Sequence, residues 1–286
     1  MTELRYVSID GTLVAAEAAR IPVTDRGFLY GDSVFETVRT YDGQDHALDR
    51  HLARLVRSAK AVEMQLPVSI DVLADEVRSL VCATDEALRV RLMVTRGDAA
   101  GLAETGPARR VMLGYHFEPH PDDHYTAGVP VRLVEGGRFL AGAKAGSYLL
   151  SVLATREARA KGGYEAILVE ALGPDGQVWE GATSNVFAVV DGVLRTASTG
   201  VLPGVTRGIV LELAEELGLA VVEGPLRVAD LRSASEVFLT SATRELMPVR
   251  ALDDQALTPG PVHASLHARY RETLQGRLDG SADGAG

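Results

Sequence analysis

The residue with the clearest chemical potential is Lys144, which lies among small side chains in the stretch AKAGSYL. The chain has only three lysines, and both Lys60 and Lys161 stand among Arg and Glu in amphipathic helical patterns. A lysine amine becomes a nucleophile when desolvation lowers its pKa, and it can then form a Schiff base with a carbonyl compound. Two interpretations follow for Lys144: a nucleophile with room for a bulky group at its amine, or a loop lysine before a helix.

Arginines on a strand pattern and on a helix pattern are candidate anion ligands. Residues 88–95 alternate in character, which places Arg89 and Arg91 on one face of a strand and a wholly apolar set on the other. Two adjacent positive charges repel, so they predict either an anionic ligand or an ion pair with a carboxylate such as Glu36. Arg54 lies off the apolar stripe of a helix predicted from about residue 47, and its position alone indicates a solvated face.

Three further stretches carry groups that could line a site. Residues 202–207, LPGVTR, open a predicted helix, whose first N–H groups can bind an anion; the alternative is an ordinary helix start capped by Thr206. Residues 239–245, LTSATRE, form a hydroxyl-rich turn between strands. Residues 24–37 are polar, rich in glycine and aromatic, which predicts either a pocket wall or a loop packed by its own Phe and Tyr.

The elements that must position these residues are strands and helices in an irregular order. Strands are predicted at 4–16 (a hairpin turning at Asp10-Gly11), 34–41, 88–95, 110–117, 129–135, 165–170, 177–180, 185–190, 193–196, 219–223, 236–240 and 248–252. Helices are predicted from about residue 47, at 69–84 and 148–161, from about residue 204, and at 227–233 and 262–277. Strands outnumber helices and no regular βαβ spacing occurs, so we expect an α+β fold of two domains.

The domain boundary is expected within residues 118–140, a polar loop followed by a strand and a glycine-rich segment. This gives a small N-terminal domain over residues 1–130 and a larger C-terminal domain over residues 131–280. Residues 281–286 have the composition of a disordered tail.

Composition excludes several classes of protein. The 286 residues carry a net charge of −10, which opposes binding to nucleic acid or to anionic membranes. No apolar run approaches the roughly 18 residues needed to cross a bilayer, and the N-terminus MTELRYVSID lacks a signal pattern, so we expect a cytoplasmic protein. The single cysteine, Cys82, excludes a disulfide framework and a Cys-based zinc site, and its helical pattern predicts a buried thiol.

Six ordered blocks of the chain together resemble the class IV aminotransferases, the fold-type IV enzymes that use pyridoxal 5′-phosphate. The blocks are DRGFLYGDSVFETVR from residue 25, HLARL at 51–55, AKAGSYL at 143–149, EAILVE with EGATSNVF up to 187, LPGVTR at 202–207 and EVFLTSATRELMPV at 236–249. The resemblance spans nearly the whole chain. It implies a small α/β sandwich-like domain, a larger cofactor-binding domain with a β-barrel-like core, and a homodimer whose sites borrow residues from the partner.

The resemblance assigns cofactor roles residue by residue. Lys144 matches the Schiff-base lysine, which also carries the proton between the substrate Cα and the cofactor C4′. Glu180 matches the carboxylate that keeps the pyridine nitrogen protonated, and Arg54 matches the arginine whose fork binds the phosphate. Tyr148 matches the tyrosine that hydrogen-bonds the cofactor phenolate oxygen, although some branched-chain enzymes have it five residues after the lysine rather than four. Further phosphate contacts are implied at Val205, Thr206 and Thr243.

The implied substrate pocket departs from the branched-chain pattern at two places. Tyr30 and Phe35 match its aromatic walls, but Thr37 stands where branched-chain enzymes usually have Gly. The late turn reads Ser-Ala-Thr at 241–243 instead of Gly-Thr-Ala, so Ala242 lacks the usual hydroxyl, which Thr243 or Ser241 would have to replace. D-amino-acid enzymes carry an Arg-x-His pair after Arg-Gly, and residues 98–107 contain neither residue. The substrate contacts implied or expected are Tyr30, Phe35, Arg89, Arg91, Ala242 and Thr243.

The leading hypothesis is a pyridoxal-phosphate-dependent aminotransferase with a ping-pong mechanism. It would move an amino group from a branched-chain L-amino acid to a 2-oxo acid, with Arg91 and Arg89 facing the second carboxylate of 2-oxoglutarate. The first alternative is a 4-amino-4-deoxychorismate lyase, which releases pyruvate and 4-aminobenzoate. A D-amino-acid or amine transaminase, and a catalytically silent protein on the same scaffold, are the remaining alternatives. No metal, nucleic-acid or membrane partner is expected.

Overall fold

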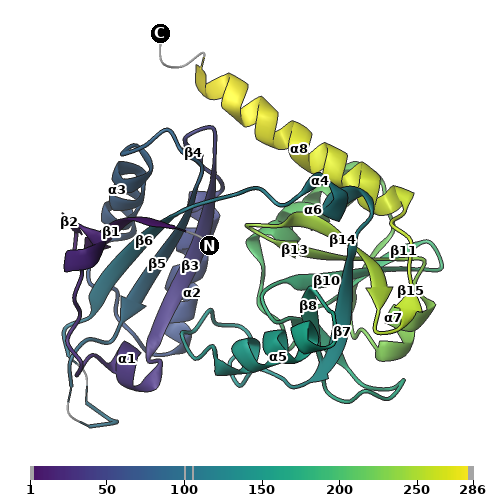
Figure 1. The fold of residues 1–286 in the computed structure, drawn as a ribbon, viewed down its shortest axis with the longest axis horizontal. Helices are drawn as coiled ribbons and strands as arrows, with labels where there is room; N and C mark the ends of the chain where they lie inside the picture. Colours follow the sequence, from purple (N-terminus) through teal and green to yellow (C-terminus); the bar gives the residue numbers. More distant parts are fainter. Residues whose placement is uncertain (1–2, 100, 105, 283–286) are drawn as a thin grey trace. The chain divides into compact units, whose positions relative to one another are not determined.

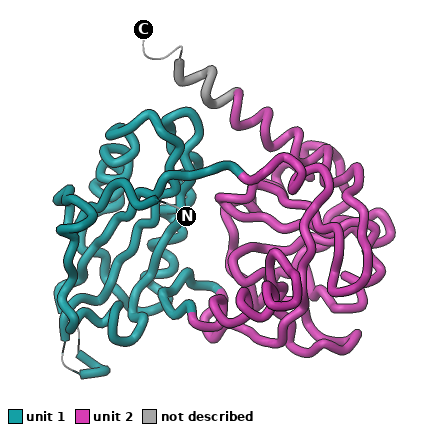
Figure 2. Tube along the Cα trace, viewed as in Figure 1, with its two compact units in different colours: residues 1–119, 142–148 teal, residues 120–141, 149–286 magenta. Residues whose placement is uncertain are grey.

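The computed structural model describes residues 3–99, 101–104 and 106–282, apart from the side chains of 276–282. Its contacts divide the chain into two compact units, one of residues 1–119 with 142–148 and one of residues 120–141 with 149–286 (Figure 2). The first division falls inside the predicted window of 118–140. Residues 142–148 group with the first unit, whereas the sequence placed them in the second domain, because their backbone bonds to a strand of the first unit.

Unit 1 is built on a six-stranded sheet in the order β2-β1-β6-β5-β3-β4 (Figure 1). Every strand pairs antiparallel with its neighbours. The strands are β1 (Leu4–Ile9), β2 (Thr12–Val14), β3 (Ser33–Tyr41), β4 (Gln44–Asp45), β5 (Leu88–Thr95) and β6 (Arg109–His116). Asp10 and Gly11 both have positive φ, as the predicted type I′ turn requires.

One face of this sheet packs on helices α2 (Leu48–Ala61) and α3 (Ile70–Val81). The apolar stripe predicted from residue 47 forms the contact surface of α2, and the alternating Val90, Leu92 and Val94 of β5 meet it. Ser69 caps α3 by accepting a hydrogen bond from Val72 N. Cys82 at the end of α3 is exposed, so the prediction of a buried thiol was wrong.

Unit 2 is built on a nine-stranded mixed sheet in the order β12-β11-β10-β13-β14-β7-β8-β9, with β15 paired to β14. Its strands are β7 (Val129–Glu135), β8 (Glu165–Val169), β9 (Val178–Gly181), β10 (Asn185–Val190), β11 (Val193–Ala197), β12 (Val221–Gly224), β13 (Glu236–Ser241), β14 (Glu245–Leu252) and β15 (Gln255–Ala256). β10 and β9 stand far apart in this order yet contact one another, so the sheet curls around one apolar core. This confirms the predicted barrel-like core.

Four longer helices complete unit 2: α5 (Leu149–Ala160), α6 (Val205–Glu216), α7 (Val228–Ser233) and α8 (Pro261–Ala282). Helix α8 includes Ser281 and Ala282 of the predicted tail, while residues 283–286 lie outside the described part of the chain. The short helices η1 (Ala16–Ala18), α1 (Arg26–Tyr30) and α4 (Asp122–Thr126) occupy segments without helical periodicity in the sequence. Within the described residues, no helix combines the length and apolarity that crossing a membrane requires.

Candidate active site

The backbone of Lys144 is fixed on unit 1 by β3 and α2. Phe35 N donates to Lys144 O at 2.9 Å, and Lys144 N donates to Ser58 Oγ at 3.0 Å. The amine Nζ lies 4.6 Å from the centroid of the Phe35 ring. A Cβ on Gly146 would stand only 1.9 Å from Ser33 Oγ, so this small residue allows close approach to β3 rather than making room at the amine.

Tyr148 and Arg91 lie around the same phenylalanine. The Tyr148 and Phe35 rings meet edge to face at 5.3 Å, and the Arg91 guanidinium stacks 3.9 Å from the Phe35 centroid. Lys144, Tyr148, Phe35 and Arg91 therefore form one group on the face of the sheet opposite α2 and α3. This group combines an amine, a phenol and a guanidinium around an apolar ring.

The arginine-bearing face of the sheet is the one that the alternation predicted. Register places Arg91 opposite Thr37 and Arg89 opposite Arg39, and Arg89 stacks 4.6 Å from the centroid of Tyr115. Within the described ranges, neither Arg89 nor Arg91 has an ion pair with a carboxylate. Burial lowers the pKa of Arg91, and the charge of Arg89 acts in the same direction. An anion on this face would relieve that repulsion.

Glu36 is not the partner of these strand arginines, because it points to the opposite face and pairs with α2. Arg54 donates to it from Nε at 2.8 Å and from Nη2 at 2.6 Å, while His51 Nδ1 lies 2.8 Å from Oε2. Burial alone would raise the pKa of Glu36, but the charge of Arg54 and hydrogen bonds from Arg54 and His51 hold it at about 2. Burial lowers the pKa of His51, so its imidazole is neutral beside a charged pair.

Arg54 therefore belongs to a buried ion pair and not to a solvated face, since its exposed fraction is only 4%. The predicted phosphate-binding residue is held rigidly by a bidentate contact with Glu36. Tyr30, the second predicted aromatic wall, is half-exposed at the end of α1, with the Arg26 guanidinium 5.2 Å from its ring centroid.

On unit 2, Glu180 is buried at β9 and engaged through both carboxylate oxygens. Its Oε2 accepts from Leu202 N at 2.9 Å and from Asn185 Nδ2 at 3.2 Å, and its Oε1 lies 3.0 Å from Arg138 Nε. Arg138 also donates to Ala182 O at 2.9 Å. A buried carboxylate with a cationic partner and two hydrogen bonds is fixed in direction.

Asn185 links Glu180 to the predicted phosphate turn. It donates to both Glu180 and Leu202 O, and a Cβ on Gly204 would stand 1.9 Å from its Oδ1. Gly204 is the N-cap of α6 and has no side chain that could cap the helix, whereas Thr206 lies within its first turn. Among the described residues, the N–H groups of Val205 and Thr206 at the start of α6 have no acceptor, so they can bind an anion.

The late turn between β13 and β14 lies beside the same segment of unit 2. Arg244 donates to Thr183 Oγ1 at 2.8 Å and pairs with Glu165 at 2.8 Å, which ties the turn to the residues after Glu180. Ala242 and Thr243 are half-buried, and the Ser241 hydroxyl is buried with no hydrogen-bond partner among the described residues. A buried hydroxyl that has no partner among the described residues fits an anionic group such as a phosphate.

Three residues that contact the buried carboxylates Glu36 and Glu180 were not predicted from the sequence. Asn185 could have been found, since it lies in the block EGATSNVF, but its type alone gave no role. Arg138 and His51 carried no recognisable signal, because each becomes meaningful only through the carboxylate it contacts. No cluster of His, Cys, Asp and Glu suited to a metal occurs in the part of the chain that the structure describes.

Comparison with known proteins shows the family to which the chain belongs. Unit 1 places a lysine beside aromatic rings, and unit 2 places a buried ion-paired carboxylate near the start of a helix; residues of these kinds suit a pyridoxal-phosphate enzyme. The family model for amino-transferase class IV matches residues 33–252, and the chain belongs to this family. It is therefore a pyridoxal-phosphate-dependent aminotransferase, and the expected fold type IV is confirmed.

Named relatives extend over nearly the whole chain. A putative branched-chain-amino-acid aminotransferase of Methanocaldococcus jannaschii is 34% identical over 93% of this chain and 95% of its own. The D-alanine aminotransferase of Bacillus licheniformis is 31% identical over 94% of this chain and 96% of its own. The solved branched-chain aminotransferase of Thermoproteus uzoniensis, with norvaline, has a TM-score of 0.87 at 30% identity, covering 96% of this chain and 95% of its own.

Proposed function

We propose that this enzyme transfers amino groups between branched-chain L-amino acids and 2-oxo acids such as 2-oxoglutarate, with a ping-pong mechanism. The observation that carries the proposal is the group of Lys144, Phe35, Tyr148 and Arg91, in which the amine and a guanidinium both lie against one apolar ring. An aliphatic side chain suits the apolar wall, and the second carboxylate of 2-oxoglutarate suits Arg91. The name of the Methanocaldococcus jannaschii relative supports the same substrate class.

The cofactor contacts are assigned to residues whose surroundings fit them. Arg54 and the N–H groups of Val205 and Thr206, with the late turn at Thr243, hold the phosphate, and the orphaned Ser241 hydroxyl replaces the one absent at Ala242. Tyr148 would donate a hydrogen bond to the phenolate oxygen of the bound cofactor. When bound, pyridoxal phosphate supplies a carbonyl for the lysine and an electron sink for the substrate Cα.

The chain's own groups then move and hold protons. With the cofactor bound, Lys144 would be the group that takes up and returns the proton of the substrate Cα, which requires a neutral amine. Glu180 keeps a proton on the ring nitrogen, and its contacts with Asn185 and Leu202 N prevent it from turning away. Arg91 orients dicarboxylic substrates, while Phe35 and Tyr30 exclude water from the aliphatic part.

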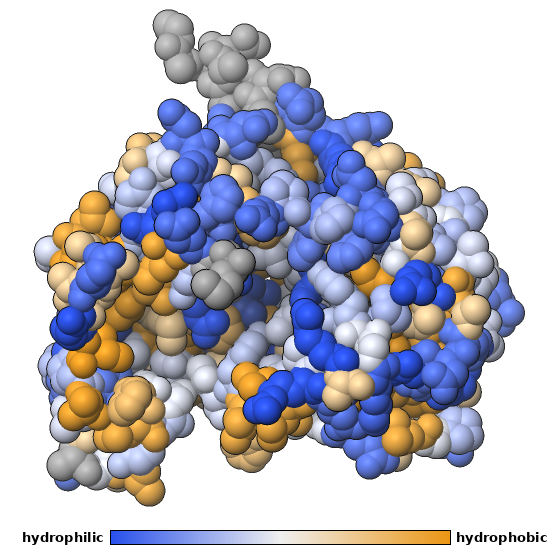
Figure 3. Space-filling model, in the orientation of Figure 1, coloured by the Kyte–Doolittle hydropathy of each residue, from blue (hydrophilic) through white to orange (hydrophobic). Residues whose placement is uncertain are grey.

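Homodimer formation is part of the proposal. Helix α5 exposes Leu149, Val152 and Leu153, with exposed fractions of 67%, 47% and 54%, and hydrophobic side chains are visible on the surface around this helix (Figure 3). Apolar side chains grouped on a helix surface are typical of an interface, and the family resemblance points to a second copy as the occupant. Light scattering on the purified protein should give twice the monomer mass; a monomer at micromolar concentration would contradict this part. We also place the enzyme in the cytoplasm.

A substrate panel tests the reaction assignment. The holoenzyme is mixed with single amino acids without a 2-oxo acid, and the change in cofactor absorbance is followed. We expect rapid conversion by L-leucine, L-isoleucine and L-valine and little by D-alanine. Preferential conversion by D-alanine would instead favour the activity named for the Bacillus licheniformis relative. Pyruvate release from 4-amino-4-deoxychorismate, with no amino-acid half-reaction, would assign the lyase.

A further inference from the structure

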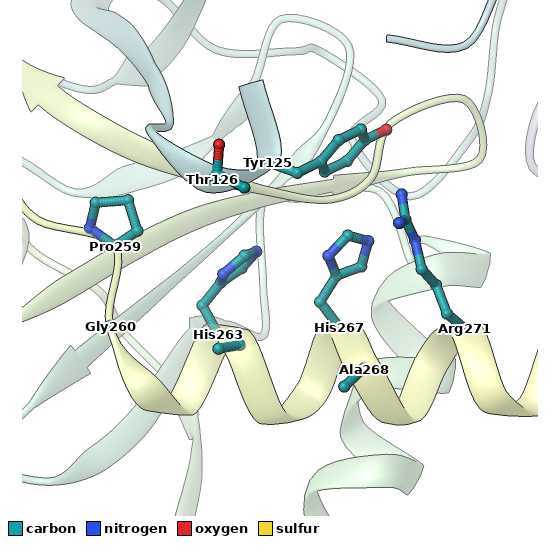
Figure 4. A pocket seen from close by; sticks show the side chains of 9 residues that line it. Tyr125, Thr126, Pro259, Gly260, His263, His267, Ala268 and Arg271 are labelled. Atoms are coloured by element: carbon teal, nitrogen blue, oxygen red, sulfur yellow. The ribbon is translucent and has the colours of Figure 1, made fainter. Parts of the chain in front are cut away.

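Unit 2 carries a second group of polar side chains along helix α8, two buried histidines and a half-exposed arginine. His263, His267 and Arg271 follow one another at intervals of four residues and line one side of a cleft of about 480 Å³, which Tyr125 and Thr126 of α4 border from the other side (Figure 4). None of these residues has a role in the proposed reaction.

All three side chains of α8 contact the first two residues of β14. His263 Nε2 lies 3.1 Å from Leu246 O, His267 Nε2 lies 2.9 Å from Glu245 Oε2, and Arg271 Nε donates to the same Oε2 at 3.0 Å. The Tyr125 ring stacks on His267 at 5.0 Å and lies 5.0 Å from the Arg271 guanidinium. The cleft thus directs its polar groups to an internal carboxylate, which favours a structural latch over a ligand site.

Glu245 is an unusual residue to be held in this way. Its side chain is nearly buried, and its backbone adopts φ +55°, a left-handed conformation that is costly for a residue with a Cβ. Such a conformation persists only where the surroundings fix it. Glu245 pairs with Ser241 across the hairpin, so its backbone conformation sets the path of the three residues between them.

The other side of the turn is held as firmly. Arg244 bonds to Tyr164 Oη at 3.1 Å, to Thr183 Oγ1 at 2.8 Å and to Glu165 at 2.8 Å. Arg244 is therefore bound to β8, whereas the adjacent Glu245 is bound to α8. The turn carrying Ala242 and Thr243 is positioned by both anchors.

We propose that Glu245, latched by His267 and Arg271, is a positioning residue for the turn that contacts the cofactor phosphate. This inference rests on the proposed function, in which Ser241 and Thr243 meet the phosphate. Weakening the latch lets the turn relax, so the phosphate loses contacts while Lys144 and Glu180, which hold the reacting part, remain in place. Phosphate affinity therefore falls more than the catalytic rate of the loaded enzyme.

The test compares three variants of the holoenzyme. Glu245→Gln keeps the side-chain shape but removes its charge, and Arg271→Gln weakens the latch at a residue whose side chain is half-exposed. Arg269→Ala is the control: Arg269 lies on α8 like Arg271, but it forms a solvent-exposed ion pair with Glu216 of α6 and does not contact the turn. The measurements are the dissociation constant for pyridoxal phosphate by dialysis, the 31P chemical shift of the bound cofactor, and kcat at saturating cofactor.

We expect Glu245→Gln to raise the cofactor dissociation constant at least about tenfold, equivalent to about 1.4 kcal/mol, and to shift the 31P signal. Arg271→Gln should act in the same direction, and kcat should fall less than affinity in both. Affinities and 31P shifts equal to those of Arg269→Ala would overturn the inference. If Glu245→Gln does not fold, Arg271→Gln decides alone. A wild-type protein without bound pyridoxal phosphate would refute the proposed function itself, which is a distinct outcome.

Discussion

Replacing Glu36 by Gln should destabilise unit 1 strongly, since it leaves the buried Arg54 cation without its counter-charge. The pKa of Glu36 is held at about 2 against an ordinary 4.5, and this difference corresponds to about 3 kcal/mol in favour of the ionised form. Removing one partner of a buried ion pair costs about 3–5 kcal/mol. We therefore expect the free energy of unfolding at pH 7 to fall by about 3 kcal/mol.

The dependence of folding stability on pH gives a second test of this prediction. Because the pKa of Glu36 is lower in the folded state, its stabilising contribution is complete above about pH 4.5 and is lost as the pH falls toward 2. Denaturant unfolding of the wild type between pH 7 and 2 should show this loss, and Glu36→Gln should lack it. Glu86→Gln is the control, because its ion pairs are solvent-exposed and worth about 0–1 kcal/mol. If the free energy of unfolding of Glu36→Gln lies within about 1 kcal/mol of the wild-type value, the buried pair does not stabilise the charged state as argued.

Four further outcomes are expected. Lys144→Ala should remain folded but hold no covalent cofactor, and borohydride labelling of another lysine in the wild type would contradict this. Glu180→Gln should retain the cofactor but lose at least about a hundredfold in turnover, about 2.7 kcal/mol of barrier; near-native kcat would mean the carboxylate is misassigned. Arg91→Leu should raise the KM for 2-oxoglutarate far more than that for 2-oxo-4-methylpentanoate, and equal effects would make Arg91 structural. Burial lowers the pKa of His263 to about 4, so the folded state loses stability as the pH falls from 6.5 to 4, and His263→Gln should flatten the decline in melting temperature over that range.

Hydrophobic periodicity predicted the long helices and strands well, because an element that is buried on one face carries apolar residues at regular intervals. The alternation of β5 put Arg89 and Arg91 on the correct face, but it could not tell which carboxylate lies on which side of the neighbouring strand. Register decides that, and it turns Glu36 toward α2. The sequence therefore left open an ion pair that the structure excludes for these two arginines.

Hydrophobic periodicity did not predict which polar residues are buried. Arg54 lies off the apolar stripe of α2 yet is buried, and a pattern that counts only hydrophobic side chains assigns such a position to solvent. Only the family resemblance marked it as functional. The helices α1 and α4 are five residues each, too short for a repeat of 3.6 residues to be visible.

The path of the chain through residues 142–148 has a consequence for how the protein is made. The chain passes between the units after residues 119, 141 and 148, so unit 1 is not complete when its first 119 residues have been synthesised. Until residue 146 is available, Phe35 N and Ser33 O on β3 lack their partners Lys144 O and Gly146 N. A fragment ending at residue 119 would therefore expose an open strand edge, which is a site for aggregation. Residues 142–148 cover that edge, so the same seven residues complete the hydrogen bonding of the sheet and carry the Lys144 amine.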